Sequence, residues 1–201
     1  MRIRSNLVLS LCLVLVIAAV TTLGPSERSL GVNVRLVYLH GAWVWTSLIA
    51  LALAAIAGTI GLLLQRRELN KWSLTAGRVG IFFWLTYIPL SMWTMQAKWN
   101  GLYLAEPRFK GAVDFAIAGN LIQVALFLLR DTRWGSLLNT LYFIALWVTL
   151  RSAEQVMHPP SPILTSDSMS IRLFFFLLVG LCLLAGWQFS LWLHRRVFSK
   201  A

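Results

Sequence analysis

This sequence has few charged residues, and acidic residues are especially scarce. Asp and Glu number 7 in 201 residues, and all charged residues make up 12% of the chain, whereas a soluble domain carries about 25%. Hydrophobic residues make up 58%, and the mean hydropathy is +0.72. This composition predicts an integral membrane protein. Since each spanning helix takes roughly 20 apolar residues, no room is left for a soluble catalytic or nucleotide-binding domain.

Cysteine is nearly absent as well. Cys12 and Cys182 lie inside separate apolar runs, so the chain offers neither a disulfide framework nor a C-x-x-C thiol pair. The C-x-x-C-H motif of covalent haem attachment is missing too. These absences exclude a thiol oxidoreductase and a c-type cytochrome.

The apolar runs also lack lysine near their middle, and Asp114 is the carboxylate nearest to one. This pattern excludes a retinal Schiff base and argues against a relay of buried carboxylates. The formal net charge of +11 would suggest nucleic acid in a soluble protein, but in a membrane protein basic loops orient the chain and attract anionic lipid. We therefore expect the lipid bilayer, and no nucleic acid, as a partner.

Six apolar stretches divide the chain, at residues 7–23, 42–64, 79–95, 112–129, 135–150 and 173–194. Each predicts a transmembrane helix. The sequence therefore predicts an all-α polytopic membrane protein, with six transmembrane helices in a single domain over residues 1–201. The first stretch follows Arg2 and Arg4 as in a signal peptide, but no A-x-A cleavage site precedes Gly24, so we expect it to be retained.

Lysine and arginine are divided unequally between the two sides of such a chain. Eleven lie on the side of the termini and seven on the other, which also carries five of the seven acidic residues. Basic residues favour the cytoplasmic side. We therefore predict that both termini are cytoplasmic and that the protein lies in the cytoplasmic (inner) membrane of a bacterium or archaeon.

Three segments are expected on the outer face, residues 24–41, 96–111 and 151–172. They are longer than the inner connections and rich in polar and aromatic residues, and sites are commonly built on such loops. His40 and His158 both lie in them. Two neutral imidazoles that converge from different segments can ligate a haem iron axially.

The remaining ionisable groups fit this picture. Arginines near the two histidines, such as Arg35 and Arg108, can pair with haem propionates. Glu106 and Arg108 flank Pro107, whose fixed φ predicts a local turn that positions the loop. His194 is interpreted as a basic anchor at the cytoplasmic end of the last helix.

Two stretches resemble the cytochrome c assembly superfamily, in particular its haem-handling protein C (CcmC-like) members. The first is R-L-V-Y-L-H-G-A-W at 35–43, where the family carries a similar Arg, Tyr-x-His and Trp at the head of the second helix. The second is W-N-G-L-Y-L-A-E-P-R at 99–108, which aligns with the family's outer motif W-G-x-W-W-x-W-D-x-R. Trp99, Glu106 and Arg108 fit that register, while Leu102, Tyr103 and Ala105 replace three tryptophans of the motif.

Six spans with both termini cytoplasmic and a histidine in the outer segment before the sixth span extend the resemblance over nearly the whole chain. The resemblance implies a haem-binding site. A non-covalent haem b would be held at the outer face, with His40 and His158 as ligands of the haem iron. The aromatic side chains of Trp43, Trp99 and Tyr103 would lie against the porphyrin, and arginines would meet the propionates.

The resemblance also implies binding and handover of haem during cytochrome c-type biogenesis, not an enzymatic reaction. Haem would pass to a haem chaperone, an apocytochrome or another cytochrome c maturation protein. This chain has no ATP site, so nucleotide hydrolysis would belong to separate ABC transporter subunits.

Two other functions are compatible with the sequence. One is a structural or assembly subunit of a larger membrane complex that binds no haem and packs through the small-residue stripe Ala50, Ala54 and Gly58. The replaced tryptophans favour it. The other is an electron-transfer b-type cytochrome, although such proteins usually place their ligating histidines within the spans, and this chain has none at mid-membrane.

Overall fold

The structure of the chain is a computed structural model that describes residues 2–28, 30–152 and 163–198. The predicted iron ligand His158 lies outside the described residues. The helices are, in chain order, α1 (Arg2–Thr21), α2 (Val34–Leu63), α3 (Arg67–Trp99), α4 (Pro107–Leu129), α5 (Thr132–Ser152) and α6 (Met169–Phe198). Within the described ranges the only β-type pairing is an isolated bridge between Glu27 and Gly31. The all-α fold predicted from the sequence is confirmed.

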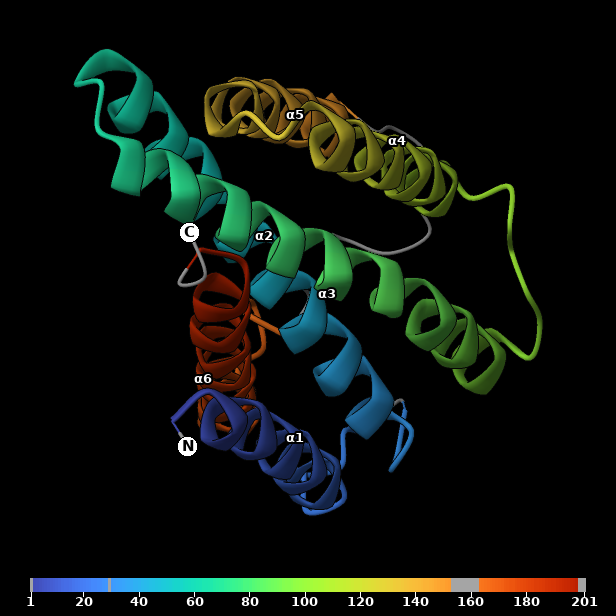
Figure 1. Ribbon diagram of the computed structural model, residues 1–201. Helices are drawn as coiled ribbons and strands as arrows, with labels where there is room; N and C mark the ends of the chain where they lie inside the picture. Colours follow the sequence, from blue (N-terminus) through green and yellow to red (C-terminus); the bar gives the residue numbers. More distant parts are fainter. Residues whose placement is uncertain (1, 29, 153–162, 199–201) are drawn as a thin grey trace.

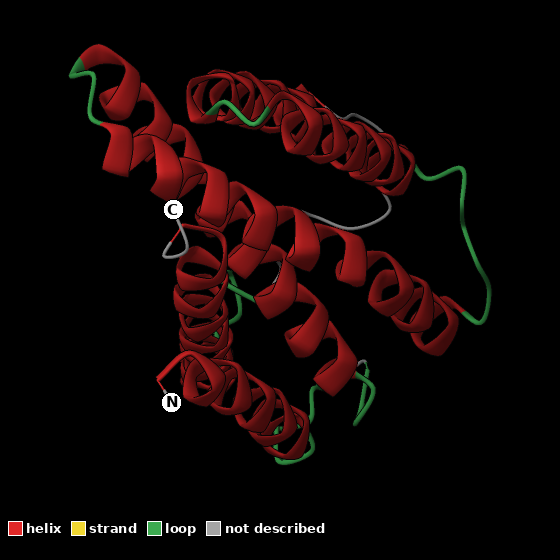
Figure 2. Cartoon of the chain, in the orientation of Figure 1, coloured by secondary structure: helices red, strands yellow, loops and turns green. Residues whose placement is uncertain are grey.

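The six helices form three pairs. In Figure 1, α2 and α3 lie side by side through the centre, α1 and α6 lie together below them, and α4 and α5 lie together above. The loop between α3 and α4, residues 100–106, is the extended green segment at the right of Figure 2. One apolar cluster joins α1, α2 and α6 around residues such as Ile17, Tyr38 and Leu178. A second cluster joins the four helices α2, α3, α4 and α5 around Leu51, Trp84 and Leu146.

Three helices, α2, α4 and α6, are long and apolar enough to cross a membrane, and Ser5–Thr21 within α1 is a shorter apolar helix. Large apolar side chains on their outer faces are exposed, for example Leu53 on α2, Leu121 on α4 and Leu173 on α6. Such faces suit contact with lipid. The structure therefore agrees with the predicted membrane class through these three helices.

The helices α3 and α5 are less apolar because they share a buried polar seam. Ser136 Oγ donates a hydrogen bond of 2.8 Å to Asn70 Oδ1, and Asn139 Nδ2 donates one of 2.9 Å to the carbonyl oxygen of Ser73. All four side chains are buried. Hydrogen bonds of this kind join helices inside a membrane bundle, so these polar residues are compatible with a buried position.

The helices are longer than the apolar stretches that predict them. The segments expected as loops at 24–41 and 96–111 shrink because α2 already begins at Val34 and α3 continues to Trp99. Hydropathy marks only the apolar part of a helix, while polar residues can continue the same backbone beyond it. α3 ends where Asn100 takes a left-handed conformation with φ of 52°, which asparagine tolerates.

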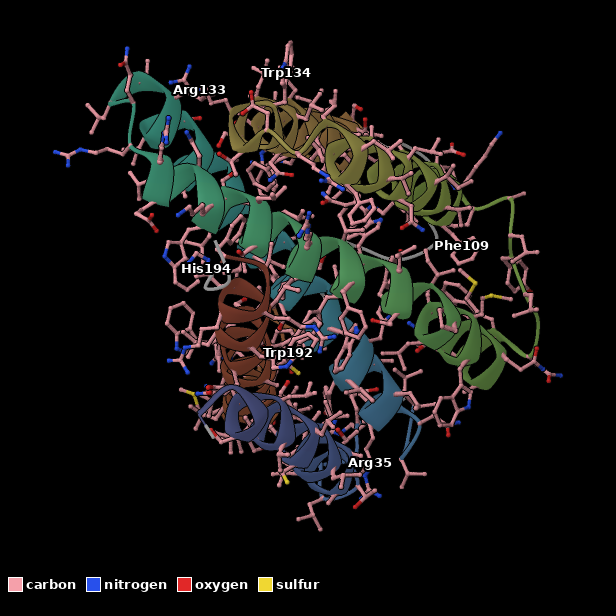
Figure 3. All side chains as sticks on the ribbon, in the orientation of Figure 1. Arg35, Phe109, Arg133, Trp134, Trp192 and His194 are labelled. Atoms are coloured by element: carbon pink, nitrogen blue, oxygen red, sulfur yellow. The ribbon has the colours of Figure 1, made fainter. Side chains whose placement is uncertain are left out.

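The first and last helices bring the two ends of the chain together. Arg195 donates a hydrogen bond of 2.8 Å to Asn6 Oδ1, and Asn6 Nδ2 donates one of 2.6 Å to Gln188 Oε1. His194, labelled in Figure 3, lies flat against Trp72 of α3 with ring centroids 4.0 Å apart. The start of α1, the start of α3 and the end of α6 therefore share one end of the bundle.

Candidate functional site

A cavity of about 200 Å³ lies towards the opposite end of the bundle, where α2 begins, α3 ends and α4 begins. We call it the His40 cavity. Along α3 it extends from Trp99 to Trp84, roughly 22 Å at 1.5 Å per residue. Its walls are mainly apolar and aromatic. The polar or charged side chains that line it are those of His40, Ser91, Thr94, Lys98, Glu106 and Arg108.

His40 reaches this cavity from the second turn of α2. Val37, His40, Gly41 and Val44 all line it, which is the i, i+3, i+4, i+7 spacing of one helix face. The imidazole is half-buried, and its ring centroid lies 5.3 Å from that of Tyr87 on α3. The cavity therefore holds one potential nitrogen ligand for a metal, flanked by an aromatic ring.

The last turn of α3 brings a cation and an indole to the cavity. Lys98 Nζ lies 5.6 Å from the centre of the Trp99 ring, a cation–π arrangement, and both residues line the cavity. Tyr103, in the following loop, meets the Trp99 ring edge-on at 5.6 Å. Tyr103 itself is 43% exposed and supports Trp99 from outside the cavity lining.

The sequence Glu106-Pro107-Arg108 begins α4. Glu106 is the N-cap, and its Oε2 accepts a hydrogen bond of 2.7 Å from the backbone N–H of Phe109. Pro107 takes the first helical position, where its missing N–H costs nothing. The turn predicted at Pro107 is thus the start of a helix, and it turns both Glu106 and Arg108 towards the cavity.

Two predicted site residues lie elsewhere. Arg35 Nε donates a hydrogen bond of 2.9 Å to the Gly24 carbonyl, which fastens the connection between α1 and α2. Figure 3 places Arg35 at the start of α2, well away from Phe109 at the cavity. Trp43 donates to Thr86 Oγ1 at 2.8 Å and lines a separate hollow between α1, α2 and α3. The structure therefore brings together His40, Trp99, Glu106 and Arg108, but neither Arg35 nor Trp43.

His158 lies outside the described residues, but the residues on both sides of its segment are described. Leu150 near the end of α5 and Ile163, the first described residue after 153–162, both line the His40 cavity. The described residues Leu150 and Ile163, on either side of the segment that contains His158, therefore both lie at the cavity.

Some lining residues were not among the predicted site residues. They include Tyr87, Ser91 and Lys98, which recur along α3 at helical spacing with Trp84. This helical spacing is the feature of the sequence that could have indicated that they share one face of α3. The described residues contain no group of three or more His, Cys, Asp or Glu placed to hold a metal ion by themselves.

Comparison of the chain with protein-family models, curated proteins and solved structures finds no match. The chemistry of the site therefore rests on its geometry. An aromatic slot with one imidazole, two cations and a buried carboxylate suits a flat, apolar molecule that carries a metal and acidic groups.

Proposed function

We propose that the chain crosses the cytoplasmic membrane of a bacterium or archaeon six times, with both termini in the cytoplasm and the His40 cavity at the outer face. Its six helices have 20 to 33 residues, so each is at least about 30 Å long, the thickness of the hydrocarbon core. The two ends of the chain meet at the end of the bundle opposite the cavity. The excess of basic residues on that side supports the same orientation.

The proposed function of the His40 cavity is to bind haem b without a covalent bond and to release it for cytochrome c-type biogenesis. One observation carries this proposal: a single aromatic cavity collects His40, Trp99, Lys98 and Arg108 from three helices. Because a porphyrin supplies four nitrogen ligands itself, one imidazole suffices to attach its iron to the protein. The two cations can pair with the propionates.

The size of the cavity favours a transient complex. At about 200 Å³ it is smaller than the roughly 300–1,000 Å³ of pockets that enclose a drug-sized ligand. Haem would therefore be held with part of its ring outside the cavity. Partial enclosure suits a protein that hands its ligand on.

His158 is the proposed second ligand of the iron. The segment that carries it is bounded by Leu150 and Ile163, which both line the cavity. Pro159 and Pro160 follow the histidine directly and restrict the backbone there. His158 would supply the second axial nitrogen to an iron bound by His40.

The loop between α3 and α4 is the proposed contact for the protein that receives the haem. Leu102, Tyr103 and Leu104 are 47%, 43% and 51% exposed, next to the cavity-lining residue Trp99. Three consecutive exposed apolar side chains beside the bound haem suit docking of a haem chaperone or apocytochrome. Any energy for a later release step would come from separate ABC transporter subunits. The chain itself would act by binding and not as an enzyme.

The structural-subunit alternative relied on the stripe Ala50, Ala54 and Gly58 as a surface for a partner. Ala54 is completely buried, and a Cβ at Gly58 would lie 2.8 Å from Ser73 Oγ on α3 and 2.9 Å from the Ser136 carbonyl on α5. This part of the stripe is therefore used for packing within the chain. Haem binding is the function that we retain.

Haem titration of the purified protein tests the proposal. The wild type should give a shifted Soret band, and His40→Ala should bind haem more weakly and give the Soret band of a five-coordinate haem. His194→Ala is the matched control, because His194 lies at the opposite end of the bundle against Trp72. Absence of binding by the wild type, or equal binding by His40→Ala, would overturn the proposed function.

A further inference from the structure

One carboxylate oxygen of Glu106 has no hydrogen-bond donor among the described residues. The residue is 6% exposed, and Oε2 caps α4 through Phe109. Oε1 is buried and accepts no hydrogen bond from any described residue. A buried polar atom of this kind calls for an explanation. Because Glu106 lines the His40 cavity, the charge of a bound ligand can provide one.

The N-terminus of α4 and two basic side chains lie near the Glu106 carboxylate. The capping hydrogen bond from Phe109 and the N-terminus of α4 both stabilise a negative charge. Lys98 and Arg108 line the same cavity. The carboxylate thus places a fixed negative charge inside an otherwise largely apolar site, where water screens it poorly.

Glu106 and His40 line the same cavity. Tyr87, which also lines this cavity, contacts the imidazole with ring centroids 5.3 Å apart. An iron bound to His40 would therefore experience the field of Glu106. A porphyrin offers no hydrogen-bond donor at its ring edge, so the charge of the metal is the property to which this carboxylate responds.

The two oxidation states of haem differ in that charge. With the porphyrin counted as a dianion, ferrous haem is neutral at its centre and ferric haem carries one positive charge. A nearby carboxylate stabilises the second relative to the first. We infer that Glu106 makes the His40 cavity selective for ferric over ferrous haem, an inference that rests on the proposed haem-binding function.

Two metalloporphyrins that do not change oxidation state test this inference. Gallium(III) protoporphyrin has the central charge of ferric haem, and zinc(II) protoporphyrin has that of ferrous haem. The affinity of the wild type for each should be measured by fluorescence titration in detergent. The ratio of the two affinities, gallium over zinc, reports the selectivity.

Glu106→Gln removes the charge but keeps an oxygen that can cap α4. We expect it to lower the gallium-to-zinc ratio about tenfold, the order given by two unit charges about 10 Å apart at an effective dielectric constant near 20. Glu106→Asp keeps the charge and should retain most of the ratio. Glu68→Gln removes an equal charge from an exposed position near the start of α3 and should leave the ratio unchanged.

The outcomes separate this inference from the function on which it rests. If the wild type binds neither porphyrin, the haem-binding function fails, and the selectivity falls with it. If the wild type binds both and Glu106→Gln has the same ratio, the selectivity alone is overturned. A circular-dichroism melt of each variant verifies that it is folded. If Glu106→Gln is unfolded, Glu106→Asp, which keeps the charge, is compared with the wild type instead.

Discussion

Asn139 of α5 donates a hydrogen bond of 2.9 Å to the backbone carbonyl of Ser73 on α3, in the buried interior of the bundle. The same amide packs against Gly77, where an added Cβ would lie 2.5 Å from Nδ2. One side chain thus supplies both a hydrogen bond and the close contact between two helices. The contact fixes α5 against α3.

Removing that amide should destabilise the protein. Asn139→Ala leaves the Ser73 carbonyl without this partner and should lower the free energy of unfolding by about 1 kcal/mol, the order measured for hydrogen bonds between membrane helices. Asn120→Ala is the control, since Asn120 is exposed on α4. Unfolding in mixed detergent gives both values, and equal midpoints for the two variants would contradict the assigned role.

Close packing at Gly58 gives a second prediction. A Cβ there would lie 2.9 Å from the backbone oxygen of Ser136, which cannot move without shifting α5. Gly58→Ala should therefore cost about 1–3 kcal/mol, the range for overpacked cores. Gly180 on α6 has nothing within 4 Å of an added Cβ, so Gly180→Ala should be neutral or stabilising. Similar losses in both variants would mean that α2 and α5 are not in tight contact.

The helices could be predicted from the sequence because each contains an apolar run, but their ends could not. The expected loop at 24–41 contains the first two turns of α2, including His40. Polar and basic residues at a membrane surface are compatible with both helix and loop. The seam of Asn70, Ser73, Ser136 and Asn139 was also missed. Asn70 and Ser73 precede the apolar stretch at 79–95, and a polar residue inside an apolar stretch, such as Ser136 or Asn139, does not reveal which helix it will face.

Residues near each other in the sequence proved a poor guide to the site. Arg35 lies five residues before His40, which on a helix turns it by about 140° away from the imidazole. It therefore meets Gly24 instead of the cavity. Glu106 and Arg108 could be found because the start of α4, marked by Pro107, places both beside the end of α3. Tyr87 and Lys98 required knowledge of which face of α3 is turned inward.

The proposed topology predicts opposite accessibility for two exposed positions. In a chain whose two cysteines are replaced, Leu102→Cys should react with a membrane-impermeant maleimide in intact cells whose outer barrier is permeable to it. Arg133→Cys, at the other end of the bundle, should react only after the cytoplasmic membrane is opened. Both parent residues are exposed, so accessibility to water is not limited by burial. Labelling of Leu102→Cys from the cytoplasmic side alone would invert the scheme and remove the outer haem site.

The loss of the helix cap should be separable from the loss of charge at Glu106. Glu106→Ala removes the acceptor of the Phe109 N–H and should cost about 1 kcal/mol, as for other N-caps. Glu106→Asp, which preserves a carboxylate, should cost less. Hydrogen exchange at the first turn of α4 measures the effect locally, and unchanged protection in Glu106→Ala would show that the cap does not hold this turn.

The last prediction concerns His40 and His158 together. If both bind one iron, either single alanine variant should leave a five-coordinate, high-spin haem that dissociates more readily, and the double variant should lose haem, because aromatic and propionate contacts rarely retain it without an iron ligand. The optical and electron paramagnetic resonance spectra of the three variants distinguish these states.

Added imidazole provides the control for that experiment. It should restore a six-coordinate spectrum to each single variant, since it can occupy the vacated position on the iron, but it should not rescue binding by the double variant to the same extent. With iron–nitrogen bonds near 2 Å, the two ring nitrogens must come within roughly 4 Å of each other across the metal. If His158→Ala leaves the spectrum and the dissociation rate unchanged, His40 binds the iron without it.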